Sequence, residues 1–228
     1  MYISITKRCN MRCAHCCYSC EASGPDMDWD VFHAIIDKWG MLYAQGNSYV
    51  SLGGGEPTLH PKFWSMIYYI QGIGLMPWVA TNGKQKEPAL ILCELAKQGR
   101  VAACLSLDKW HEPIDEEVVV AFKTGLKKKN HKYYETWLSC NKKQDDLREI
   151  RTALIPYYGG RAKNLKPVAH FCPCVGINFE PSGEIRACGC DDSPIIGDYK
   201  KGIKAKQWKY YDVFNGCWKK LNGLYKGN

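Results

Sequence analysis

The sequence predicts an α/β protein: a partial (β/α)6 TIM-like barrel followed by a small C-terminal extension made of a β-hairpin and a helix. Two observations predict the barrel. Short strand-like segments alternate with segments of helical apolar spacing, and polar residues gather directly after the strand-like segments. A third observation, cysteine pairs flanking a hairpin pattern, predicts the extension. We expect a barrel domain over residues 1–160 and an extension over residues 161–228.

Two strand–loop–helix units open the chain. A cysteine-rich loop follows the first strand, and a glycine run follows the second. Asp26 and Asp28 are candidate caps of the first helix. The strands are expected over residues 2–6 and 49–52, and the helices over residues 28–44 and 61–72.

Four further strands complete the predicted barrel at a similar spacing. They are expected over residues 78–80, 101–107, 134–139 and 153–157, with helices over residues 87–98, within 115–128, and over 144–151. In parallel barrels the chemistry lies on the loops that follow the carboxyl ends of the strands. The polar residues after these strands are therefore candidate site residues. The stretch from Tyr158 to Pro167, rich in Gly, Lys and Pro, is the expected domain boundary.

Length and composition indicate an ordinary folded protein. A chain of 228 residues has room for one main domain and an appendage. No apolar run approaches the about 18 residues that span a bilayer, so we expect no membrane partner. The N-terminal residues enter a strand-like alternation without the features of a signal peptide, which predicts a cytoplasmic protein.

The net charge of +8 favours a polyanionic partner, although a solvated basic surface explains it equally well. The C-terminal stretch from residue 200 interleaves aromatic residues with lysines, a pattern that can stack on bases and pair with phosphates. An amphipathic helix that packs its aromatic face on the barrel is the alternative. The aromatic residues are Trp208, Tyr210, Tyr211, Phe214 and Trp218.

Thirteen cysteines are too many for chance, and most lie in two groups that predict two metal sites. In the first group Cys9, Cys13 and Cys16 have CxxxCxxC spacing. Three thiolates can hold three irons of a cubane cluster and leave the fourth iron open to another ligand. With Cys20 added, the same loop can instead form a closed structural zinc site.

The cysteine loop together with Gly54-Gly55-Glu56-Pro57 resembles the radical S-adenosylmethionine superfamily, whose signatures are CxxxCxxC and GGEP. His15 stands where that family usually has an aromatic residue. The resemblance implies a [4Fe-4S] cluster with an open iron site on Cys9, Cys13 and Cys16, and S-adenosylmethionine bound to it. It also implies reductive cleavage to a 5′-deoxyadenosyl radical, with a reducing partner such as flavodoxin or ferredoxin.

Further site residues follow from the resemblance and from the predicted strand ends. Asp108 and His111, just beyond a predicted strand end, can touch substrate, and Cys140 can return hydrogen to a product radical. These three are the candidate catalytic residues. A surface histidine and a small core cysteine are the plainer interpretations of His111 and Cys140. The cofactor-binding residues are expected to be Gly53, Gly54, Gly55, Glu56, Pro57, Thr81, Asn82, Ser106 and Asp108.

The second cysteine group flanks a hairpin that turns at residues 181–183. The run from Cys172 through Gly183 to Cys188 resembles the start of the auxiliary-cluster extension called SPASM or Twitch. We therefore expect an auxiliary iron-sulfur cluster, with a zinc knuckle as the alternative. Its expected ligands are Cys172, Cys174, Cys188 and Cys190, with Cys217 as a possible substitute.

Three hypotheses of function follow. The first is a radical enzyme that modifies or rearranges a nucleobase or nucleotide, such as the bases of hypermodified phage DNA, and the charge and aromatic tail favour it. The second is a radical enzyme that modifies a peptide; against it, the motif begins at residue 9, which leaves no room before it for a leader-binding domain. The third is a non-catalytic, zinc-stabilised nucleic-acid-binding module.

Overall fold

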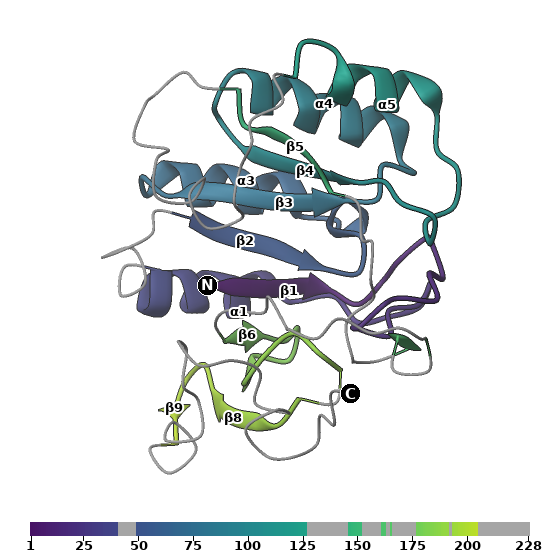
Figure 1. Cartoon of the computed structure of the whole chain (residues 1–228). Coiled ribbons are helices and arrows are strands. Elements are labelled where there is room, and N and C mark those ends of the chain that lie inside the picture. Colours follow the sequence, from purple (N-terminus) through teal and green to yellow (C-terminus); the bar gives the residue numbers. More distant parts are fainter. Residues whose placement is uncertain are drawn as a thin grey trace, which may run out of the picture.

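The computed structural model describes residues 1–40, 49–126, 146–151, 161–162, 165, 177–191 and 193–204. Its parallel strands are β1 (Tyr2–Thr6), β2 (Tyr49–Gly54), β3 (Met76–Thr81), β4 (Ala102–Ser106) and β5 (Arg148–Arg151). They are followed by β6 (Asn178–Phe179), β7 (Glu184–Arg186), β8 (Ile195–Asp198) and β9 (Gly202–Ile203). All lie in one sheet, in the order β5-β4-β3-β2-β1-β6-β7-β8-β9 (Figure 1).

Strands β1 to β5 run parallel to their neighbours, so their carboxyl ends share one edge of the sheet. The loop that follows β1 lies at this edge, beside the arrowheads in Figure 1. The strand–helix alternation predicted for the first four units is confirmed. The helices are α1 (Trp29–Ile35), α3 (Phe63–Gly72), α4 (Lys86–Lys97) and α5 (Glu116–Lys123), with a π-helical turn at Ile36–Gly40 and a 3-10 turn at Pro57–Leu59.

Apolar spacing explains why these segments fold as helices. In α3, Phe63, Met66, Ile67 and Ile70 lie on one buried face, each no more than 2% exposed. Burial of each such side chain contributes roughly 1.5–3 kcal/mol. Among the helices that the structure describes, none combines the length and apolarity needed to cross a bilayer.

Strand β1 is buried on both faces, as expected for a strand inside a parallel sheet. Ile3 and Ile5 lie in the apolar core, and the alternate residues Ser4 and Thr6 are equally buried. Their hydroxyls have partners: Ser4 donates to the Asn178 side chain at 3.0 Å, and Thr6 donates to Asp26 at 2.6 Å. The core strand therefore carries polar links to the C-terminal segment and to the cysteine loop.

The predicted hairpin at residues 181–183 is confirmed. Strands β6 and β7 pair antiparallel, and β6 pairs parallel to β1. Gly183 has a φ of +85°, a conformation that favours glycine. A Cβ there would lie 2.4 Å from the Tyr199 ring, so the turn also needs the missing side chain. The hairpin extends the sheet on the side of β1 opposite β2.

The helix predicted over residues 144–151 is wrong, because Arg148–Arg151 forms β5 and pairs with β4. The charged residues in this segment suggested an exposed helix. Arg148 is nevertheless buried, since its guanidinium lies 2.6 Å from the Asp146 carboxylate and donates to the Ala121 carbonyl at 2.5 Å. The fifth strand of the sheet is therefore β5; the segments predicted as strands at 134–139 and 153–157 lie outside the described residues.

The first helix begins where expected, at Trp29, but its predicted caps do not act as such. Asp28 occupies the N-cap position without a side-chain hydrogen bond to the helix. Asp26 instead accepts hydrogen bonds from Thr6 and Arg8. Asp26 therefore serves the loop before the helix rather than the first turn of the helix. Residues 41–44 of the predicted helix lie outside the described residues.

Candidate metal centre

Residues 7–27 form a loop that leaves β1 and returns to it. The Cys9 N–H donates to the Glu21 carbonyl at 2.8 Å, which closes the cysteine-rich part of the loop. At the end of the loop, the Met27 N–H donates to the Ile5 carbonyl at 2.8 Å. The loop is therefore held to the strand that precedes it.

Arg161 fixes the inner turn of this loop from a distant part of the chain. Its backbone N–H donates to the Cys16 carbonyl at 2.9 Å. Its side chain donates to the Cys13 carbonyl at 3.1 Å and to the Cys20 carbonyl at 2.9 Å. One residue thus holds three carbonyls of the cysteine loop. The sequence did not reveal this role, because Arg161 lies in the stretch predicted to be a domain boundary.

The thiols of Cys9, Cys13 and Cys16 are partly buried and act on one another. Burial raises the pKa of Cys13 to about 11, and the neighbouring Cys9 and Cys16 thiolates add to the rise. Burial also raises the pKa of Cys9. The pKa of Cys16 is lowered to about 6, first of all by a hydrogen bond from Cys20. Three converging soft donors of this kind fit an iron-sulfur cluster with one open iron.

The glycine segment after β2 packs against the start of the cysteine loop. The Gly55 N–H donates to the Thr6 carbonyl and the Glu56 N–H to the Arg8 carbonyl, both at 2.8 Å. A Cβ on Gly54 would lie 2.1 Å from the Thr6 oxygen, and one on Gly55 would lie 1.9 Å from the Arg8 oxygen. Residues 54 and 55 must therefore be glycines, because a side chain would collide with these two carbonyls. The N–H groups of Gly55 and Glu56 are already used within the protein.

Glu56 is the centre of a buried network that joins the ends of β2 and β3. Its side chain accepts hydrogen bonds from the Thr58 hydroxyl at 2.7 Å, the Thr81 hydroxyl at 2.9 Å and the Asn82 N–H at 2.7 Å. The residue is 1% exposed, and burial raises the pKa of its carboxyl group. Glu56 and Thr81, both predicted to bind cofactor, therefore bind each other in this structure. Pro57 begins the 3-10 turn that follows.

Asn82 connects the end of β3 to the cysteine loop. Its side-chain amide donates to the Asn10 side chain at 2.8 Å and lies 3.7 Å from the Cys9 sulfur as a donor. Its side-chain oxygen accepts from the Lys84 N–H at 2.9 Å. Asn82 thus contacts one of the predicted cluster ligands directly, and Asn10 is a further residue of this site that the sequence did not single out.

Asp108, after β4, gathers two histidines beside Cys13. Its carboxylate accepts from His111 Nδ1 at 2.9 Å, and His15 Nε2 lies 3.9 Å from the same carboxylate. The ligand atoms of Cys13, His15 and His111 all lie within 4.8 Å of one another. Burial lowers the pKa of His15 to about 4, which keeps its ring neutral at pH 7. The site residues predicted after β1 and β4 are therefore brought together.

Two buried ring nitrogens at this position have no hydrogen-bond partner among the described residues. They are His15 Nδ1 and Trp110 Nε1. A buried polar atom that lacks a partner is costly, and it commonly marks the place of a ligand, a water or an ion. These atoms therefore indicate a ligand position beside the cysteine loop.

The sequence model of the Radical SAM superfamily matches residues 3–154, which include the cysteine loop, the glycine segment and Asn82. The chain belongs to the radical SAM superfamily. The match covers most of the predicted barrel domain and none of the predicted extension.

Three curated relatives each match less than half of this radical SAM chain. A tungsten-containing aldehyde ferredoxin oxidoreductase cofactor-modifying protein of Pyrococcus furiosus is 35% identical over 109 residues, which is 47% of this chain and 30% of that protein. Mycofactocin maturase MftC of Mycobacterium ulcerans is 32% identical over 105 residues, 46% of this chain and 27% of that protein. A nucleotide dehydratase of a Thermoplasmatales archaeon is 34% identical over 83 residues, 36% of this chain and 28% of that protein. The matched stretches therefore span less than a third of each relative.

Solved structures of radical SAM enzymes share the fold. BtrN aligns with a TM-score of 0.56 at 15% identity, covering 98% of this chain and 83% of that chain. The enzyme anSMEcpe aligns with a TM-score of 0.55 at 16% identity, covering 95% and 80%. With the parallel sheet described above, these likenesses confirm the predicted class of a partial TIM-like barrel.

At the far side of the radical SAM site, Ser106 ends β4 and Arg151 ends β5. The Ser106 hydroxyl accepts from the Arg151 guanidinium at 3.0 Å. Arg151 is thus a polar residue at the functional edge of the sheet that the sequence analysis had placed in a helix. Cys140, the predicted hydrogen donor, lies outside the described residues.

The C-terminal cysteines lie beside the same loop. Cys188 and Cys190 are buried, and the Asp191 N–H donates to the Cys17 carbonyl at 3.0 Å. Cys172 and Cys174, the other two predicted ligands of the second site, lie outside the described residues. By its spacing alone, Cys17 does not fit the three-ligand CxxxCxxC pattern and is only a neighbour of that motif.

Proposed function

We propose that this radical SAM protein holds a [4Fe-4S] cluster with Cys9, Cys13 and Cys16 and binds S-adenosylmethionine at the open iron. When bound, these groups supply reductive cleavage of the sulfonium and a 5′-deoxyadenosyl radical that abstracts hydrogen from substrate. The observation that carries the proposal is the packing of the loop that holds the three thiols against the glycine segment, at one edge of the sheet.

The residues around the thiols have separate tasks in this proposal. The Gly55 and Glu56 N–H groups are used within the protein, so this segment would offer its carbonyl oxygens to the methionine amino group, which is a donor. Asn82 donates to the Cys9 sulfur, and such hydrogen bonds tune a cluster's reduction potential. Ser106 and Asp108, at the end of β4, are proposed to contact the cofactor and the substrate.

Reductive cleavage tests the chemistry directly. The protein, reconstituted with iron and sulfide under anaerobic conditions, is expected to convert S-adenosylmethionine to 5′-deoxyadenosine when a reductant is added. Cys13→Ala is expected to abolish this conversion, and the matched control Cys104→Ala, which removes a buried core thiol, to retain it. Undiminished conversion by Cys13→Ala would refute the ligand assignment. In cells, a flavodoxin or ferredoxin is the proposed reductant.

We propose a nucleobase or nucleotide as the substrate. The net charge of +8 supports a polyanionic partner, and the relative named as a nucleotide dehydratase supports this substrate class. Beside the site, the Trp110 ring lies 4.8 Å from the Lys109 ammonium, a pairing suited to a base and its phosphate. The similarity to mycofactocin maturases favours a peptide as the second candidate.

Isotope transfer decides between these substrates. Deuterated nucleotide and peptide pools are incubated separately with the reconstituted protein, and deuterium is followed into 5′-deoxyadenosine. Transfer from the nucleotide pool alone is the expected result, and transfer from the peptide pool alone would replace the substrate assignment. Membership of the radical SAM superfamily favours either enzyme over a non-catalytic zinc module.

We further propose that the extension, residues 161–228, carries an auxiliary iron-sulfur cluster. The buried pair Cys188 and Cys190 beside the hairpin supports it, and Cys172 and Cys174 remain the predicted additional ligands.

A further inference from the structure

Cys17 lies against the cysteines of the C-terminal hairpin rather than against the thiols that precede it. The Cys190 thiol is the main neighbour that raises the pKa of the Cys17 thiol, and it also raises the pKa of the Cys188 thiol. The Asp191 N–H donates to the Cys17 carbonyl at 3.0 Å, so the backbones are joined as well. Thiols from the two ends of the described chain therefore form one group.

The turn that carries Cys188 and Cys190 is closed by its own hydrogen bonds. The Cys188 N–H donates to the Ser193 hydroxyl at 2.9 Å, and the Ser193 N–H donates to the Cys190 carbonyl at 2.9 Å. The Arg186 guanidinium donates to the Ser193 carbonyl at 2.5 Å. The two thiols are therefore held in place before any ligand binds.

Close contact between this turn and the cysteine loop requires Gly189. A Cβ at this position would lie 2.6 Å from ring and hydroxyl atoms of Tyr18. Tyr18 in turn stacks on Tyr2 of β1, with ring centroids 5.7 Å apart. The absence of a side chain at residue 189 thus allows the turn to approach the segment that carries Cys17.

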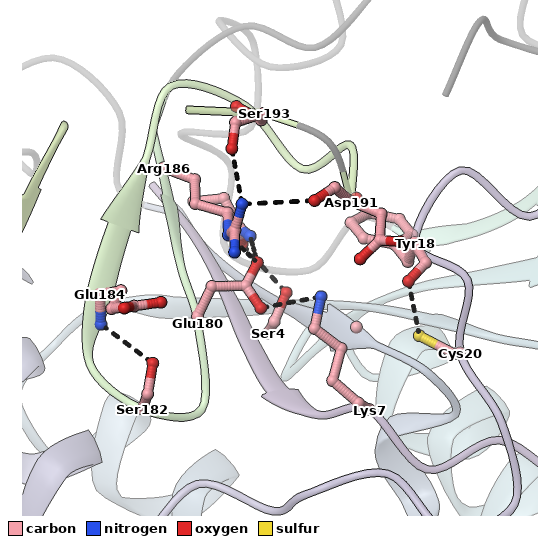
Figure 2. A network of polar contacts seen from close by, with 12 residues as sticks. Ser4, Lys7, Tyr18, Cys20, Glu180, Ser182, Glu184, Arg186, Asp191 and Ser193 are labelled. Carbon is pink, nitrogen blue, oxygen red and sulfur yellow. Dashed lines mark hydrogen bonds and ion pairs between the residues drawn. The ribbon is translucent and has the colours of Figure 1, made fainter. Parts of the chain in front are cut away.

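A buried ionic network fixes the hairpin to the start of the cysteine loop. The Glu180 carboxylate lies 2.8 Å from the Lys7 ammonium and 3.6 Å from the Arg186 guanidinium, and the Asn178 amide donates to it at 2.6 Å. Figure 2 shows Glu180 between Lys7, at the start of the loop, and Arg186, which holds the cysteine turn. The Glu180 side chain is only 7% exposed, so these paired charges are buried. They hold the turn in place relative to the loop that carries Cys17.

The surroundings of these thiols differ from those of core cysteines. Cys93 and Cys104 lie on a regular helix and a regular strand, among the apolar residues of the core. Cys17, Cys188 and Cys190 lie on irregular loops, and Cys190 interacts with both of the others. Grouped buried thiols are the preferred ligands of iron-sulfur clusters and of zinc.

We propose that Cys17, Cys188 and Cys190 are ligands of one auxiliary iron-sulfur cluster, so that the adjacent residues Cys16 and Cys17 serve two different clusters. This inference rests on the auxiliary cluster of the proposed function and adds to it a ligand from the barrel domain. Because adjacent Cα atoms are about 3.8 Å apart, the two clusters are held as close neighbours. Electrons can then pass between them without leaving the protein.

Removal of the first cluster isolates the second for the test. In a Cys9→Ala, Cys13→Ala, Cys16→Ala background, residual iron, acid-labile sulfide and the electron paramagnetic resonance signal report the auxiliary cluster alone. Addition of Cys17→Ala is expected to remove them, and addition of Cys104→Ala to leave them unchanged. Circular dichroism and thermal melting of each variant check that it is folded.

Unchanged iron and sulfide after Cys17→Ala would overturn the inference, as would zinc in place of iron or a background that holds no cluster. A second measurement uses the wild-type holoprotein: Cys17 is expected to resist alkylation until the clusters are removed with a chelator. Free alkylation of Cys17 in the iron-loaded protein, or a Cys17–Cys190 disulfide after anaerobic purification, would also overturn it. Because 5′-deoxyadenosine formation by the wild type is measured separately, failure of the radical chemistry is distinguishable from failure of this ligand assignment.

Discussion

The side-chain amide of Asn82 donates to the sulfur of Cys9 across 3.7 Å, which links the end of β3 to the first cysteine of the CxxxCxxC motif. The link depends on Glu56, which accepts the Asn82 backbone N–H at 2.7 Å. Glu56, which is buried between the ends of β2 and β3, thus positions Asn82 beside Cys9, a proposed cluster ligand.

Asn82→Leu is expected to shift the reduction potential of the first cluster to more negative values, because a thiolate that has lost a donor is more electron-rich. Formation of 5′-deoxyadenosine should fall by about 10- to 100-fold, the usual effect of a residue that supports a metal ligand. Potentiometric titration and a timed cleavage assay measure these effects. Gln98→Ala, which removes an exposed amide on α4, is the matched control. An unchanged potential would show that Asn82 does not tune the cluster.

Arg161→Ala is expected to loosen the cysteine loop, because two side-chain hydrogen bonds to the Cys13 and Cys20 carbonyls are lost. Each hydrogen bond from a charged group contributes about 1.5–3 kcal/mol. Hydrogen exchange across residues 9–20 should accelerate, and iron content should fall. Arg12→Ala is the control, since the Arg12 side chain is 79% exposed and lies 3.5 Å from Glu21. Equal exchange in both variants would contradict the role of Arg161.

Gly55→Ala is expected to destabilise the protein by about 3 kcal/mol or more, because an overpacked site that meets backbone atoms cannot relax easily. Its Cβ would lie 1.9 Å from the Arg8 carbonyl oxygen. Gly72→Ala is the opposite case: at the end of α3, a Cβ meets nothing within 4 Å. That variant should be neutral or stabilised by up to about 1 kcal/mol. Chemical denaturation measures both, and equal effects would contradict the contact.

The pH dependence of stability should report His60. Its Nε2 donates to the Met27 carbonyl at 2.9 Å, and its Nδ1 accepts from the Lys62 N–H at 3.0 Å, which requires a neutral ring. Burial lowers the pKa of His60 from the usual 6.5. Above pH 6.5 the His60 ring is neutral in both the folded and the unfolded chain. As the pH falls below this value, His60 binds a proton in the unfolded chain but stays neutral in the folded protein.

The contribution of His60 to stability is therefore expected to fall below pH 6.5, by up to about 1.4 kcal/mol per pH unit, until the folded-state pKa is reached. His15, whose pKa is lowered to about 4, adds a fall of the same sign. Denaturation curves from pH 7 to pH 5 should show this slope in the wild type and a shallower slope in His60→Gln. Gln98→Ala, at an exposed position after α4 that does not titrate, should keep the wild-type slope. A wild-type slope in His60→Gln would show that another group is responsible.

Local pattern was sufficient to predict the first four strands and most of the helices between them. Residues 63–72, for example, bury the apolar face that their spacing predicts. The same pattern placed the cysteine loop and the glycine segment at the carboxyl ends of neighbouring strands, where the structure brings them into contact. These features are readable because each depends on residues close together in the chain.

The errors occurred where a distant partner decides the structure. Arg148 can be buried in a strand because, beside its neighbour Asp146, the distant carbonyls at the end of α5 accept hydrogen bonds from its guanidinium. Residues 148–151 then complete the sheet beside β4. No periodicity within the segment shows this, since its charged side chains indicate an exposed helix when taken alone.

The sequence by itself determined the superfamily, the three thiols proposed to hold the first cluster, and the parallel sheet that presents them. Only the tertiary structure decided what surrounds those thiols: the clamp from Arg161, the amide of Asn82 and the contact between Cys17 and Cys190. Each is a contact between residues far apart in the chain. Such contacts follow from how β1 lies between β2 and β6, and the spacing of residues along a single chain carries no record of them.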